Sequence, residues 1–175
     1  MNSHQILLIL ALGFLIPSLI IPWVDIDFIG ESHSYTPLKI SKSILINDKS
    51  DSVFDLVKII RPYKLSSILL ISSMTLYFGS LLVLIDSTIN GKKQNKIYLI
   101  LGLLLILSVI FYALSIEIYK SEFSNVANKT GGIIGEEFKG KENLIINNII
   151  KEGYGYKLTI IGSVFLILSY FWKEN

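Results

Sequence analysis

Long apolar stretches alternate with polar segments along the 175 residues of the chain. Four of these stretches reach the length of about 20 residues that a helix needs to cross the hydrocarbon core of a bilayer. They cover residues 5–24, 65–85, 97–116 and 153–172, and none has a charged side chain in its middle. We expect the first to be a retained helix, because the residues before it include no Lys or Arg as a signal sequence would. The pattern predicts a membrane-embedded, all-α bundle of four helices.

The placement of lysines predicts the orientation of this bundle. The segment 86–96 between the second and third stretches holds Lys92, Lys93 and Lys96 against a single acid. Short basic loops stay in the cytoplasm, so this turn and both termini are expected there, in a multi-pass protein of the plasma membrane. The two long segments, 25–64 and 117–152, then face outward. A sequon, Asn128-Lys129-Thr130, lies in the second of them and makes Asn128 a candidate glycosylation site.

Shorter periodicities in the two outer segments predict a small α+β cap outside the membrane. The runs VDIDF (24–28) and YTPLKISKSILI (35–46) alternate between apolar and polar residues, which is typical of two strands joined by a turn at residues 30–33. Residues 53–60 and 143–151 place their apolar side chains at helical spacing instead. We therefore expect a hairpin and two short helices to form one extracellular cap.

Small and aromatic residues at the ends and faces of the spans have expected structural roles. Helices pack closely in lipid where small residues let their backbones approach, and the candidates are Ser72, Gly79, Gly102 and Gly162. Tryptophan and tyrosine favour the membrane–water interface, and the candidate anchors are Trp23, Tyr154, Tyr156 and Trp172.

Composition supports the membrane assignment and removes several kinds of chemistry. The chain is 51% hydrophobic and only 17% charged, whereas a soluble domain carries about 25% charged residues. It contains no cysteine, which excludes disulfides and thiolate metal sites. Its basic residues are scattered, so nucleic acid is not an expected partner. Abundant Ile, Lys and Asn with a single arginine, Arg61, indicate an AT-rich prokaryotic genome.

One cluster of side chains resembles a metal site. Asp25, Asp27, Glu31 and His33 follow the first span, and oxygen ligands at alternate positions suit Ca²⁺, while a histidine admits a transition metal. The alternative is that these residues form the solvated side of the hairpin. No cofactor is expected, because both histidines lie outside the spans. No catalytic residues are proposed, since no nucleophile–base set accompanies the carboxylates and no G-x-S-x-G occurs.

The order of these features resembles the claudins and related tetraspan membrane proteins. The resemblance is carried by Trp23 just after the first span, by the alternating runs VDIDF and YTPLKISKSILI, and by four spans with two outer segments. It implies a first outer segment folded as strands and a second one that joins the sheet. The claudin Gly-Leu-Trp motif and its two cysteines are absent, so the resemblance implies architecture and not barrier or pore formation.

These observations predict a non-enzymatic tetraspan protein that acts through its cap. We expect a structural or accessory subunit of a membrane or surface assembly, with lipid and either a protein partner or further copies of the chain as its contacts. Two alternatives stay open: an oligomeric channel or transport component, and a cap that binds a metal ion or another ligand. Spans that carry only hydroxyl groups, with no ionisable side chain at mid-membrane, disfavour a pump or a secondary transporter.

Overall fold

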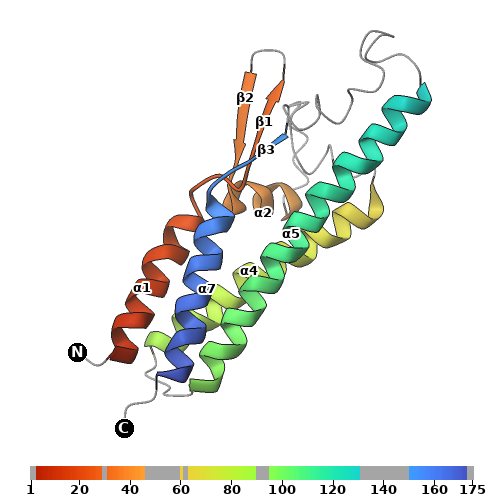
Figure 1. Ribbon diagram of the computed structural model, residues 1–175. Coiled ribbons are helices and arrows are strands. Elements are labelled where there is room, and N and C mark those ends of the chain that lie inside the picture. Colours follow the sequence, from red (N-terminus) through yellow and green to blue (C-terminus); the bar gives the residue numbers. More distant parts are fainter. Residues whose placement is uncertain are drawn as a thin grey trace.

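Helices and a three-stranded sheet make up the described part of the computed structural model, which covers residues 3–28, 31–45, 60, 63–89, 95–130 and 150–172. The helices α1 (Ser3–Ser18), α4 (Lys64–Ile89), α5 (Asn95–Thr130) and α7 (Gly155–Phe171) correspond to the four apolar stretches. α4 packs on α5, α5 on α7, and α7 on α1. The sheet lies at one end of these helices, while the start of α1 and the end of α7 lie together at the other (Figure 1).

Two of the helices are long and apolar enough to cross a membrane by length and composition. They are α4 and the part of α5 from Lys96 to Glu122, whereas α1 and α7 are apolar but shorter. α5 extends well beyond residue 116, where the third span was expected to end. Its 36 residues have a length of about 54 Å at a rise of 1.5 Å per residue, which exceeds a hydrocarbon core of about 30 Å.

The contact between α4 and α5 follows a seven-residue repeat. The buried positions of α4 include Ser66, Ser73, Ser80 and Ser87, each seven residues from the next, with larger side chains between them. Such spacing suits two helices that cross at a small angle. Serines also bond across the contact: Ser66 Oγ donates to the Ser115 carbonyl at 2.7 Å, and Ser73 Oγ donates to that of Ser108 at 2.7 Å.

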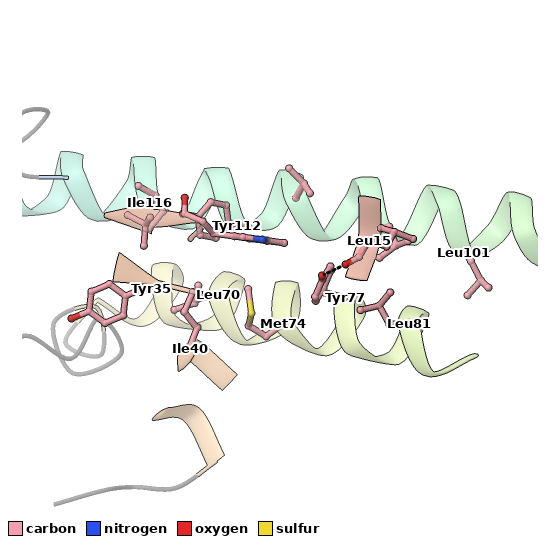
Figure 2. Packing of buried hydrophobic residues seen from close by; sticks show 14 of the residues in the cluster. Leu15, Tyr35, Ile40, Leu70, Met74, Tyr77, Leu81, Leu101, Tyr112 and Ile116 are labelled. Carbon is pink, nitrogen blue, oxygen red and sulfur yellow. Dashed lines mark hydrogen bonds between the residues drawn. The ribbon is translucent and has the colours of Figure 1, made fainter. Parts of the chain in front are cut away.

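Larger apolar side chains fill the space between these serines. Figure 2 shows Leu70 and Met74 of α4 facing Tyr112 and Ile116 of α5, with Leu15 of α1 reaching the same layer. The opposite faces of the helices expose large apolar side chains, among them Ile9, Ile16, Ile68, Leu82, Ile100, Leu103, Ile110 and Val164. These helices are therefore apolar on both their inner and outer sides.

The sheet combines strands from both segments that were expected to face outward. β1 (Val24–Phe28) is central and pairs antiparallel with β2 (Glu31–Tyr35) and with β3 (Ile150–Glu152). The strand predicted at 24–28 is confirmed, with Val24 and Ile26 buried. We call this sheet, together with helix α2 (Pro37–Leu45), the cap.

The second predicted strand, at residues 35–46, is wrong. Most of it is helix α2, and residues 31–33, which were expected in a turn, belong to β2. Thr36 begins the helix, because its Oγ1 accepts the Lys39 backbone N–H at 3.2 Å, and Pro37 occupies the first helical position. The buried residues Pro37 and Ile40 then lie one turn apart.

The other two short helices are placed only in part. Residues 53–59 lie outside the described residues. The predicted helix at 143–151 has only its last two residues in the described part, and there the backbone is strand β3. Pairing with β1 explains this difference, since β1 offers Ile26 and Asp25 as partners for Ile150 and Lys151.

Candidate functional site

The junction between the cap and the helices is built around Trp23. Its side chain is completely buried, and its ring lies edge-on to Tyr77 of α4 and Tyr112 of α5, with centroids 5.1 Å and 5.0 Å away. Its Nε1 donates to the Ser18 carbonyl at 3.1 Å. The expected role of Trp23 as a membrane-interface anchor is therefore wrong, because an anchor must face lipid and this indole is enclosed by protein.

The end of α1 supplies acceptors to the same junction. The Leu19 N–H bonds to the Ile16 carbonyl instead of that of Leu15, which leaves the Leu15 carbonyl without its usual helical donor. Ser18 Oγ donates to it at 2.7 Å, and the Tyr77 hydroxyl lies 3.3 Å away, the contact drawn in Figure 2. Helix α1 was expected to reach residue 24. It ends instead at Ser18, where side chains of α1 and α4 bond to the Leu15 carbonyl.

Two glycines allow the second outer segment to approach this junction closely. The Gly153 N–H donates to the Trp23 carbonyl at 2.8 Å, and the Gly155 N–H donates to that of Pro22 at 2.8 Å. A Cβ at Gly153 would lie 2.1 Å from the Pro22 carbonyl oxygen, and one at Gly155 would lie 2.4 Å from the Trp23 ring. The Tyr112 hydroxyl also donates to the Trp23 carbonyl, at 2.7 Å. Side chains larger than hydrogen are excluded at both glycines.

The four candidate metal ligands do not converge. Asp25 and Asp27 pair with Ser34 and Ser32 on one face of the sheet, whereas the pairing Ile26↔His33 and Phe28↔Glu31 puts the other two candidates on the opposite face. No group of three or more potential metal ligands comes together among the residues that the structure describes. The period of two along a strand separates residues that the sequence places close together.

Each aspartate instead has a partner within the sheet. Ser34 Oγ donates to Asp25 Oδ1 at 2.5 Å, and Lys151 Nζ forms an ion pair with Asp27 Oδ2 at 2.6 Å. The hydrogen bond from Lys151, and after it one from Ser32, hold the pKa of Asp27 below its ordinary value. This polar face is a solvated side of the hairpin that also ties β3 to β1.

The other expected anchors lie near the two ends of α7. Tyr154 is 74% exposed and Trp172 is 59% exposed, so both are available to an interface. Tyr156 is half-buried, and its hydroxyl donates to the Glu152 carboxylate.

The expected helix-packing residues divide into two groups. Gly162 lies against Leu15 and the Ala11 carbonyl of α1, and Gly102 lies against Ile167 and the Ser163 carbonyl of α7. Gly79 has nothing within 4 Å of a built Cβ, so its expected packing role is wrong. The serine seam of α4 runs one residue further along than Ser72 and Gly79, through Ser73 and Ser80.

Asn128, the candidate glycosylation site, falls in the last turns of α5, and its side chain lies outside the described residues.

Several residues of the junction were missed by sequence reasoning. Tyr77 and Tyr112 are the main examples. A tyrosine in the middle of an apolar stretch does not show which side chain it will contact. Gly153 and Gly155, at the entry into the last helix, were missed as well. The serine repeat of α4 is a signal that the sequence does contain.

No protein-family model, curated protein or solved structure matches the chain. The resemblance to claudins therefore stays a prediction of topology.

Proposed function

We propose that this chain is a non-enzymatic, four-span membrane protein whose cap faces outward and binds a protein partner, as a structural or accessory subunit of a membrane assembly. The observation that carries the proposal is the fixed attachment of a polar cap to apolar helices. Trp23, Gly153 and Tyr112 link the cap to the helices through buried hydrogen bonds. A rigidly held surface suits recognition, because little ordering is needed on binding.

The exposed faces of the helices support the membrane assignment. Only 39% of the apolar window of α4 and 44% of that of α5 is buried, whereas the core helix of a soluble protein is mostly enclosed. Exposed apolar surface of this extent is typical of contact with lipid or with another protein. α1 and α7 share these exposed apolar faces, and we propose that they cross the bilayer beside α4 and α5.

The contacts of the hydroxyl groups weigh against the channel alternative. Ser66 and Ser73 donate to carbonyls of α5, so these hydroxyls hold the two helices together and do not line a path. The separation of Asp25 and Asp27 from His33 likewise weighs against a metal-binding cap.

Extraction of the protein from its native membrane in mild detergent, followed by native mass measurement, tests the proposal. We expect a complex larger than the 19.7 kDa chain. Ser32→Arg, an exposed change on the polar face of the sheet, should release the partner while helix content stays unchanged. Ile100→Ala, an exposed change on a lipid-facing helix, is the matched control and should keep the complex. A chain that is monomeric and without a partner after extraction would contradict the proposal.

A further inference from the structure

The exposed stripe of α7 begins with a lysine next to aromatic side chains. Apolar residues recur along one face of this helix at Ile160, Ile161, Val164, Leu168 and Phe171. Lys157, three residues before Ile160, and Tyr154, three residues before Lys157, continue the same face toward the cap, and both are exposed. The charge therefore lies where the apolar face ends.

The ammonium group of Lys157 lies against two aromatic rings. Its Nζ lies 5.1 Å from the ring centroid of Tyr154 and 5.8 Å from that of Tyr156. In the described part of the chain it forms no ion pair, and the Glu152 carboxylate accepts the hydroxyl of Tyr156. The N–H groups of Gly155 and Lys157 bond to the carbonyls of Pro22 and Tyr154. The side chain, and not the start of the helix, is the available donor here.

The length of the stripe matches a bilayer. Tyr154 and Trp172 are 18 positions apart, which corresponds to about 27 Å along a helix, close to a hydrocarbon core of about 30 Å. With Trp172 at one interface, Lys157 reaches the headgroup level of the other. We propose that Lys157, framed by Tyr154 and Tyr156, binds the phosphate of an anionic phospholipid in the leaflet on the cap side. This proposal rests on the membrane placement proposed above, and not on a protein partner.

The full-length protein in nanodiscs made from equal amounts of phosphatidylglycerol and phosphatidylcholine provides the test. Native mass spectrometry reads which lipid stays on the released protein. We expect phosphatidylglycerol to be retained about fivefold more often than phosphatidylcholine, the preference that one lysine near an anionic surface contributes. Lys157→Gln should bring the ratio close to one, while Lys157→Arg should keep it.

Lys42→Gln is the matched control, because Lys42 is an exposed lysine of α2 on the cap and loses the same charge. It should retain the preference for phosphatidylglycerol. Equal retention of the two lipids by the unchanged protein, or an unchanged preference in Lys157→Gln with wild-type helix content, would overturn the proposal. Failure to enter nanodiscs would overturn it together with the membrane placement, whereas loss of the protein partner in detergent would leave it standing.

Discussion

At the scale of single residues, the Trp23 carbonyl is a shared acceptor at the centre of the junction. It accepts hydrogen bonds from the Gly153 N–H and from the Tyr112 hydroxyl. Tyr112→Phe removes only the second, so the carbonyl keeps one partner. We expect a loss of about 1 kcal/mol in the free energy of unfolding, measured by denaturant titration in micelles. Tyr154→Phe, at an exposed tyrosine, should change it by less than about 0.5 kcal/mol. Equal effects of the two changes would mean that the buried bond contributes nothing.

A contrast between two glycines, Gly153 with close neighbouring atoms and Gly79 without them, gives a second prediction at this scale. A Cβ at Gly153 meets the Pro22 carbonyl, while a Cβ at Gly79 meets nothing within 4 Å. Gly153→Ala should therefore destabilise the protein by about 1–3 kcal/mol through forced backbone movement. Gly79→Ala should be neutral or stabilise it by up to about 1 kcal/mol, because alanine favours the helix. Thermal unfolding of both variants checks the contrast, and destabilisation by Gly79→Ala would show that α4 has a contact there.

At the scale of elements, strand β3 is held to β1 partly by the Asp27–Lys151 ion pair. The pKa of Asp27 is lower in the folded protein than its ordinary value of 3.8. The ionised carboxylate therefore stabilises the folded protein at pH values above the unfolded-state pKa. This stabilisation is lost as the pH falls through the folded-state pKa. We expect the denaturant midpoint to decrease below about pH 4 by more in the wild type than in Asp27→Asn.

Lys151→Gln removes the side chain that contributes most to the lower pKa of Asp27. The denaturant midpoint of Lys151→Gln should lose most of the same pH dependence. The double variant, Asp27→Asn with Lys151→Gln, should show no further loss. If both single variants keep the wild-type dependence on pH below 4, the ion pair does not contribute to the attachment of β3.

The positions of elements could be predicted from the sequence where one physical effect dominates. Four apolar stretches became four helices, and alternation at 24–28 became strand β1. Residues 35–46 also alternate, but Thr36 and Pro37 form a helix start that outweighs a period of two. The residues of this alternating run are equally compatible with a helix. The helix N-cap formed by Thr36 was therefore the more specific signal.

The candidate site was less predictable, because it depends on contacts between distant segments. Trp23 is close in sequence to a membrane boundary, yet Tyr77 and Tyr112 enclose it from helices that begin 41 or more residues later. The four candidate metal ligands lie within nine positions of one another, but the hairpin register divides them between two faces. A sequence shows spacing along the chain and does not show which strand edge β3 will occupy.

At the scale of the whole molecule, the cap lies at one end of the helices, and the start of α5 lies at the other (Figure 1). The basic segment with Lys92, Lys93 and Lys96 leads into this start. If lysine placement determines the orientation, the cap is outside and the start of α5 is in the cytoplasm. The two ends must then differ in access from outside the cell.

The chain contains no cysteine, so single cysteines report this access without a background signal. Lys42→Cys lies on the cap, and Lys96→Cys lies in the first turn of α5; both positions are exposed. A membrane-impermeant maleimide applied to intact cells should label Lys42→Cys and not Lys96→Cys, while permeabilised cells should label both. Labelling of Lys96→Cys alone in intact cells would reverse the orientation. Labelling of both in intact cells would place the two ends on one side of the membrane. This result would contradict a bundle of four crossings, because the length of α4 separates the cap from the start of α5.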